Sequence, residues 1–178
     1  MPAPRSVLLD RWAMSLFSED PELLKLAGRV TDATGAPVLG GIAVFLHGYR
    51  RTTQDIDLYA QDPDRTRASL EAMGARWVPE SREFVLEGVP IQLVTDRETG
   101  GPPEATEERQ GVLVVSLADL VRTKLRAGLD DLNRARDVAD VVELIRHVPL
   151  DKRFAARLPK EQRAAFEKLV EAVRAPRD

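Results

Sequence analysis

The sequence predicts an α/β (α+β) protein, with a small mixed-sheet core, flanking helices and a C-terminal helical region. Three observations indicate this class. Short alternating or apolar segments that are typical of strands recur between residues 55 and 95. Helical patterns precede and interrupt these segments, and from residue 116 onward only helical patterns occur. We therefore expect a core with N-terminal helices over residues 1–115, and a helical region packed on it over residues 116–178.

The composition limits what the chain can be. A chain of 178 residues that is 43% hydrophobic can bury a core. It has no cysteine and two histidines, which excludes disulfides and thiolate metal sites and argues against zinc. The net charge of −3 provides no global basic field for nucleic acid. No apolar run approaches the roughly 18–20 residues of a membrane span, and no signal-peptide pattern occurs, so we expect a cytoplasmic protein with no membrane contact.

Two helices are expected before the first strand. Residues 6–17 can form a short amphipathic helix, and Asp20-Pro21 begins a second helix that extends to about residue 31. Gly35 and Pro37 end it. We expect both helices to cover one face of the sheet.

The middle of the chain alternates helix and strand. A helix is expected over 64–73, with Gly74 following its end. Short strands are expected at 76–78, 83–87 and 90–95. Gly88-Val89 is predicted to be the two-residue hairpin turn between the last two strands, which would place Val85 opposite Gln92.

The remaining elements lead into the helical region. We expect a surface loop over 99–108, because it is rich in Gly, Pro and Glu, and then a strand over 112–115. Ser116 is a predicted N-cap for a helix that reaches about residue 127. Two further helices are expected over 133–147 and 160–174.

The stretch from residue 38 to residue 59, VLGGIAVFLHGYRRTTQDIDLY, carries the candidate chemistry. Residues two apart on a strand share a face, so Asp55 and Asp57 would present two carboxylates together. Such a pair is costly without a cation, and oxygen ligands of this kind suit Mg²⁺. Gly40 and Gly41 would let backbone N–H groups approach an anion. Together these residues predict a nucleotide site.

The motif GG-x-A-x-x-x-H-G-x-x-R-x-T-x-D-I-D-L resembles the signature of the nucleotidyltransferase superfamily with the DNA polymerase beta-like fold. It is most similar to stand-alone bacterial proteins that include AbiEii-type toxins of type IV toxin–antitoxin systems. The resemblance implies that Asp55 and Asp57 are the catalytic, metal-binding pair, with Mg²⁺ or Mn²⁺ as cofactor and an NTP as substrate. Arg51 would contact the triphosphate, which suits a guanidinium; a solvated loop arginine is the alternative. Thr53 would contact ligand or cap the turn.

The superfamily normally places a third carboxylate on a neighbouring strand, in a segment like G-V-x-I-D-L-L. In this chain Gln92 occupies that position, within Gly88 to Val94. An amide oxygen can bind a hard cation but carries no charge and cannot act as a base. Glu83 or Glu87 could compensate as diagonal neighbours of Gln92, and surface glutamates are the alternative reading.

A second, weaker resemblance lies in the C-terminal region. Residues 116–124 and 134–141 are similar to the family elements S-L-x-D-L-x-x-x-K and R-x-K-D-x-x-D-V. By this resemblance Lys124 would face the phosphates, and Asp137 and Asp140 would lie with arginines near the site. From the residues alone, Asp137 and Asp140 are three apart on one helix face and are equally consistent with structural salt bridges. We expect His47 to pack or orient a loop rather than act as a base.

Two functions follow from these patterns. One is a Mg²⁺-dependent nucleotidyltransferase that moves a nucleoside monophosphate from an NTP to a hydroxyl of RNA, protein or a small molecule. Toxin-type relatives suggest tRNA as the acceptor and a cognate antitoxin as a partner protein. The alternative is a catalytically degenerate nucleotide-binding protein with a regulatory or toxin–antitoxin role, in which Gln92 has removed turnover.

Overall fold

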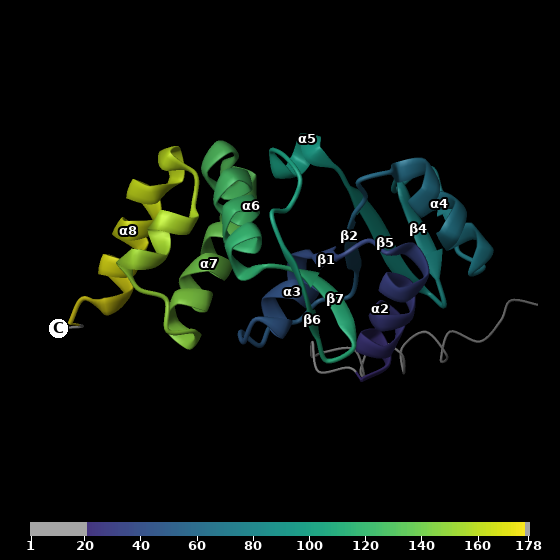
Figure 1. Cartoon of the computed structure of the whole chain (residues 1–178), viewed down its shortest axis with the longest axis horizontal. Coiled ribbons are helices and arrows are strands. Elements are labelled where there is room, and N and C mark those ends of the chain that lie inside the picture. Colours follow the sequence, from purple (N-terminus) through teal and green to yellow (C-terminus); the bar gives the residue numbers. More distant parts are fainter. Residues whose placement is uncertain (1–20, 177–178) are drawn as a thin grey trace, which may run out of the picture.

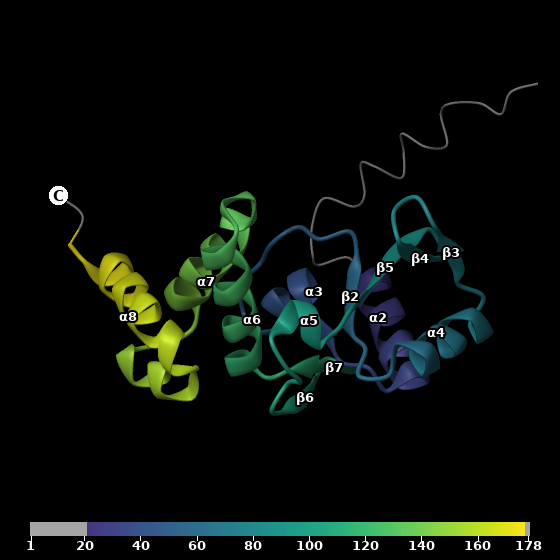
Figure 2. The same cartoon turned by 90° about the horizontal axis from the view of Figure 1, so that it is seen from above.

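The computed structural model describes residues 21–176 of the chain, and the expected helix over residues 6–17 lies outside this range. A seven-stranded mixed sheet runs through the molecule in the order β3-β4-β5-β2-β1-β7-β6. Helices α6, α7 and α8 gather at one end, beyond β7, and the strands β3, β4 and β5 lie toward the other (Figures 1 and 2). The predicted α/β class, with flanking helices and a helical C-terminal region, is confirmed.

The central strands are short and mostly buried. β1 (Val38–Leu39) pairs antiparallel with β2 (Ile56–Tyr59), and β2 pairs in parallel with β5 (Val89–Val94). β1 also pairs in parallel with β7 (Val112–Val115). Because side chains alternate along a strand, fully buried Ile56 and Leu58 point into one face of the sheet and Asp57 points to the other.

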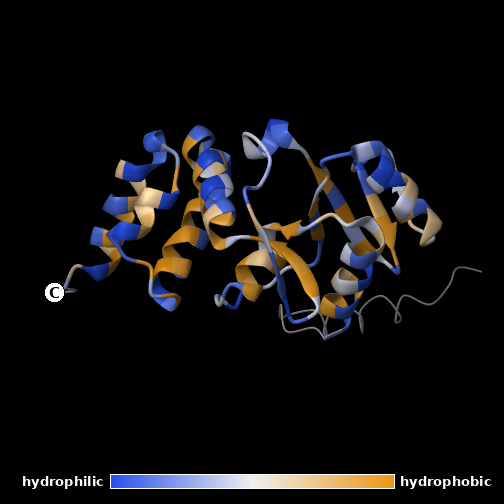
Figure 3. Ribbon diagram, in the orientation of Figure 1, coloured by the Kyte–Doolittle hydropathy of each residue, from blue (hydrophilic) through white to orange (hydrophobic). Residues whose placement is uncertain are grey.

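Helices α2 (Pro21–Thr34) and α4 (Pro63–Ala72) pack against each other on the core face of the sheet. α2 extends three residues further than predicted and is followed by Gly35, whose φ of 67° is accessible to glycine. The side chain of Asp62 caps α4 by accepting a hydrogen bond from the backbone N–H of Arg65. Hydrophobic residues concentrate on the strands and on the helix sides that face other elements (Figure 3).

The hairpin of β4 (Glu83–Leu86) and β5 differs from the prediction by one residue. Leu86 pairs with Val89, so the turn consists of Glu87 and Gly88, with φ values of 53° and 81°. Positive φ at both central residues defines a turn whose twist suits a hairpin. Because glutamate seldom adopts positive φ, the sequence indicated the wrong pair.

Two elements were missed, one just before and one at the end of the loop predicted over 99–108. α5 (Asp96–Thr99) begins with a capping box between Thr95 and Glu98. β6 (Thr106–Arg109) is a charged edge strand that pairs antiparallel with β7. The edge strand β3 (Arg76–Val78) at the other end of the sheet matches its prediction.

The C-terminal helices begin at the predicted N-cap. Ser116 accepts a hydrogen bond from the backbone N–H of Asp119 at the start of α6 (Leu117–Asp130). The elements that follow are η1 (Leu132–Arg134), α7 (Ala135–His147), η2 (Lys152–Arg157) and α8 (Lys160–Arg174). Within residues 21–176, no helix combines the length and the apolar character needed to cross a membrane.

Candidate functional site

The glycine pair begins α3 (Gly40–Leu46) and lies directly against the acidic motif. A Cβ atom on Gly40 would lie 1.7 Å from Oδ2 of Asp57, and one on Gly41 would lie 2.4 Å from Oγ1 of Thr53. Real Cβ atoms do not come this close to other atoms, so any larger residue would force Asp57 or Thr53 to shift, and Gly40 also has a φ of 67°. The glycines are therefore required to let Asp57 and Thr53 approach the start of α3. Their predicted contact with phosphate stays a prediction.

The two carboxylates of the motif differ in their surroundings. Asp55 immediately precedes β2, and its Oδ1 accepts a hydrogen bond of 2.7 Å from Thr53. Asp57, within β2, is partly buried. Burial, followed by the negative charge of Asp55, raises the pKa of Asp57 to about 7, although nearby cations oppose this shift. A cation between the carboxylates would remove this cost, so their chemistry fits a divalent ion.

Gln92 lies beside Asp57, as the resemblance implies. The parallel register of β2 and β5 places the two residues as direct partners, and both point away from the buried face that holds Ile91. Neighbouring strands are about 4.8 Å apart, so an amide oxygen and a carboxylate can share one ion. Among the described residues, no group of three or more His, Cys, Asp or Glu side chains could hold a metal. A cation at this place would therefore meet two carboxylates and an amide.

Only one of the two glutamates proposed to compensate for Gln92 remains available. Glu87 lies in the hairpin turn and forms an ion pair of 2.8 Å with Arg29 of α2, so its expected place beside Gln92 is wrong. Glu83 instead lies opposite Gln92 when the register of Phe84 with Ile91 is continued by one residue.

Three cations approach the acidic pair from the side of the C-terminal helices. Arg51 forms an ion pair of 2.5 Å with Asp140 on α7 and is mostly buried, so it is not a solvated loop arginine. Lys124 on α6 bridges Asp140 at 2.7 Å and Asp137 at 2.8 Å. Arg134 also contacts Asp137 at 2.8 Å. All three cations lower the pKa of Asp57, which places their charges near it.

The ion pair of Arg51 with Asp140 connects the motif to a residue 89 positions away. The network supports both a site role and a structural role for the C-terminal elements. Lys124 and Asp140 are buried, and such charges are stable only when they are paired. The pKa of Asp137 is lowered: Lys124 and Arg134 outweigh its burial. The network therefore ties α6 and α7 to the site and also places Lys124 and Arg51 near Asp57.

His47 has a structural position. Its buried ring lies with Nε2 2.8 Å from the carbonyl oxygen of Val115, and burial is the main cause that lowers its pKa. No described residue forms a hydrogen bond with Nδ1. A neutral ring that donates from Nε2 to this carbonyl accounts for the contact and agrees with a packing role.

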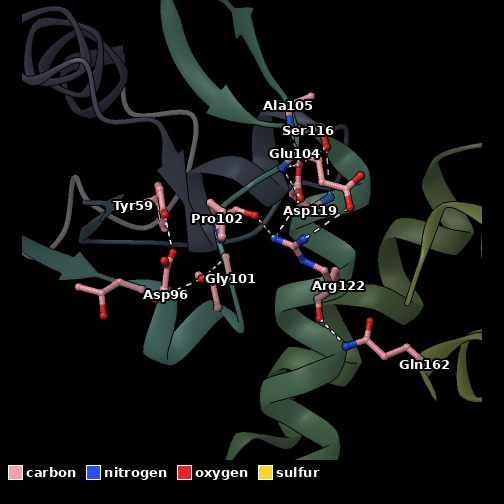
Figure 4. A network of polar contacts seen from close by, with 12 residues as sticks. Tyr59, Asp96, Gly101, Pro102, Glu104, Ala105, Ser116, Asp119, Arg122 and Gln162 are labelled. Carbon is pink, nitrogen blue, oxygen red and sulfur yellow. Dashed lines mark hydrogen bonds and ion pairs between the residues drawn. The ribbon is translucent and has the colours of Figure 1, made fainter. Parts of the chain in front are cut away.

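A second polar network, which the sequence did not indicate, attaches the segment after α5 to α6 (Figure 4). The buried carboxylate of Asp119 accepts hydrogen bonds from the backbone N–H groups of Glu104 and Ala105. Arg122 donates to the carbonyl of Pro102 and pairs with Asp119 at 3.1 Å. The spacing of Ser116 and Asp119 in the sequence identified only the N-cap. The backbone partners of Asp119 lie 14–15 residues away, and such contacts leave no recognisable sequence pattern.

Comparison with known proteins supports the fold. No protein-family model matches the chain, and no curated protein matches it. Among solved structures, an antigenic nucleotidyltransferase-like protein from Paracoccidioides brasiliensis is similar, with a TM-score of 0.54 and 14% identity over 86% of this chain and 87% of that one. A candidate nucleotidyltransferase from H. pylori has a TM-score of 0.49 and 13% identity over 85% of this chain and 78% of its own.

The first of these likenesses shows that the chain has a nucleotidyltransferase-like fold. It does not distinguish subgroups of the superfamily, so the AbiEii-type assignment stays a prediction. The strands and helices that position Asp55 and Asp57 are thus those of the fold expected from the motif.

Proposed function

We propose that the protein is a Mg²⁺- or Mn²⁺-dependent nucleotidyltransferase that transfers a nucleoside monophosphate from an NTP to a hydroxyl group. One observation carries the proposal. A partly buried carboxyl, Asp57, has its pKa raised beside a second carboxylate and the amide of Gln92, while Lys124 and Arg51 lie on its other side. A divalent cation would offset the repulsion, and the two cationic side chains suit a polyphosphate.

The proposed roles follow from the contacts. Asp55, oriented by the hydroxyl of Thr53, and Asp57 would hold the cation, with Gln92 as a neutral ligand. When bound, such an ion neutralises phosphate oxygens and the charge that develops during transfer. Arg51 and Lys124 would bind the phosphates by exchanging contacts with the carboxylates of α7 for contacts with the nucleotide.

For the acceptor and the partner protein, we propose only the class of molecule. RNA, including tRNA, a protein or a small molecule each offers a hydroxyl, and a cognate antitoxin would be a partner of a toxin-type protein. The net charge of −3 gives RNA no independent support. A cytoplasmic location remains a prediction.

The test is label transfer from α-³²P-labelled NTPs in Mg²⁺ to bacterial total RNA or to the protein itself. We expect transfer by the native protein, and its loss in Asp55→Asn and in EDTA. Glu71→Gln is a matched control because it neutralises an exposed carboxylate on α4, at the opposite face of the sheet. Equal labelling by the native protein and Asp55→Asn would refute the assignment.

A second function is favoured by one observation, the uncharged side chain of Gln92. If its amide has removed turnover, the protein binds nucleotide without transferring it and acts as a regulatory or toxin–antitoxin-type protein. Nucleotide binding without label transfer, combined with transfer by Gln92→Asp, would favour this reading over the enzyme.

A further inference from the structure

The arrangement of charges defines two sides of the proposed site. Arg51 and Lys124 approach Asp57 from the side of β1, α6 and α7. On the other side of β2 the sheet continues through β5 and β4 to β3, and the two cartoon views agree that α6 and α7 lie away from these strands (Figures 1 and 2). In phosphoryl transfer the attacking and leaving oxygens lie roughly in line. If the cations hold the departing pyrophosphate, the acceptor hydroxyl must approach over β5 and β4.

We call the surface over β5 and β4 the acceptor side. Three polar side chains form a row that leads from β2 across the strands of this side. Asp57 on β2 is the direct partner of Gln92 on β5, and Glu83 on β4 lies opposite Gln92 when the pairing of Phe84 with Ile91 is continued by one residue. All three point away from the core, because Phe84 and Ile91, which alternate with Glu83 and Gln92, are fully buried. Directly opposed residues have Cβ atoms about 4.5–5.5 Å apart, so a glutamate can extend over its neighbour.

Glu83 differs from the neighbouring Glu87 in being available. It is half-buried, and its side chain forms no hydrogen bond or ion pair within residues 21–176. Glu87 is exposed and is bound to Arg29. Gln92, between Glu83 and the acidic pair, cannot accept a proton to serve as a base. Glu83 is therefore the carboxylate that the sheet places next beyond Gln92.

We propose that Glu83 is the catalytic base of the acceptor side, an inference that rests on the proposed nucleotidyl transfer. The Glu83 carboxylate accepts the proton of the acceptor hydroxyl. At the same time the oxygen of that hydroxyl forms a bond to the α-phosphorus of the NTP. The bond between the α-phosphorus and the bridging oxygen to the β-phosphate breaks, and pyrophosphate leaves with that electron pair. The carboxylate that the superfamily normally carries at the position of Gln92 is thus replaced from the adjacent strand.

The experiment compares four proteins: native, Glu83→Gln, the exchange variant Glu83→Gln/Gln92→Glu, and the control Glu87→Gln. Label transfer from α-³²P-NTPs to total RNA or to the protein is measured beside the binding of a fluorescent NTP in Mn²⁺. We expect Glu83→Gln to lose about 10²-fold or more in transfer, as for a general base, with nucleotide affinity unchanged within twofold. The exchange variant contains the same two side chains on the opposite strands, and its transfer rate should be at least tenfold higher than that of Glu83→Gln. Glu87→Gln should transfer like the native protein.

Each result decides between the two claims. Transfer by Glu83→Gln within threefold of the native rate would overturn the role of Glu83 and leave the proposed function intact. A loss of transfer with an equal loss of nucleotide affinity, and no recovery in the exchange variant, would also overturn it, because Glu83 would then be structural. Absence of transfer in every protein, the native one included, would refute the proposed function and the inference together.

Discussion

Ionisation of the Asp57 carboxyl destabilises the folded protein, because its pKa is raised well above the usual value. Replacing this carboxyl by a neutral group should therefore stabilise the metal-free protein. Burial is the main cause that raises its pKa from 3.8 to about 7, and the charge of Asp55 is the second. Lys124, Arg51 and Arg134 oppose the shift without cancelling it. We predict that Asp57→Asn unfolds at a higher temperature than the native protein in EDTA at pH 8.

The pH dependence gives the size of this effect. Between pH 3.8 and about 7 the folded protein holds a proton on Asp57 that the unfolded chain has lost, so native stability falls as the pH rises through this window. At about 1.4 kcal/mol per pKa unit, the cost is about 2 kcal/mol at pH 5.5 and about 4 kcal/mol at pH 8. These figures are ceilings, because the side chain keeps some contact with solvent. Asparagine carries no charge, and for a chain of this size about 4 kcal/mol corresponds to roughly 10 °C in Tm.

Thermal unfolding in EDTA at pH 5.5 and pH 8 measures the prediction, with the exposed Glu71→Gln as control. The Tm gain of Asp57→Asn should be about twice as large at pH 8 as at pH 5.5. Adding Mg²⁺ at pH 8 should raise the Tm of the native protein but not that of the variant, because an ion that binds only the folded state stabilises it. A variant that is less stable than the native protein at pH 8, or a gain that is equal at the two pH values, would refute the reasoning.

Two further substitutions test the packing and the charges of the site. Gly40→Ala and Gly35→Ala share a φ of 67°, but only the first brings a Cβ onto Asp57. Gly35→Ala should cost about 1–2 kcal/mol by chemical denaturation, Gly40→Ala about 1–3 kcal/mol more, and equal costs would contradict the close contact. Lys124→Met removes one of the two cations that pair with each of Asp137 and Asp140 and should cost about 2–3 kcal/mol, the size of a hydrogen bond between charged groups. Lys25→Met, at an exposed ion pair, should leave the denaturation midpoint unchanged, and a Lys124→Met protein as stable as this control would show that the buried pairs contribute little.

The sequence predicted most elements because their signals are local. The Ser116 N-cap, Gly35 after α2 and the period-two pattern at β2 each state a backbone preference within a few residues. Edge strand β6 escaped because a strand exposed at a sheet edge needs no apolar alternation, and T-E-E-R has none. The hairpin was misplaced because its tertiary setting holds Glu87 at positive φ, against the preference of that residue.

The sequence predicted those parts of the site whose positions follow from the strand register of the fold. The resemblance placed Gln92 beside Asp57, and the parallel pairing of β2 with β5 has that register. The partners of Arg51 and Lys124 were only suggested, because their ion pairs depend on how α6 and α7 dock on the core. No spacing rule relates residues whose sequence separation is 89, as for Arg51 and Asp140.

Charge balance explains why the same contacts can serve both the fold and the site. Seven ionisable side chains meet there: the carboxylates Asp55, Asp57, Asp137 and Asp140, and the cations Arg51, Lys124 and Arg134. With Asp57 ionised and no metal bound, the negative charges exceed the positive ones by one, so a free triphosphate would add negative charge to a site that is already negative. A bound divalent cation would reverse that sign. Arg51 could then exchange Asp140, and Lys124 could exchange Asp137, for phosphate oxygens, provided that the ion binds no later than the nucleotide. No buried charge would be left unpaired, because Lys124 would still pair with Asp140 and Arg134 with Asp137.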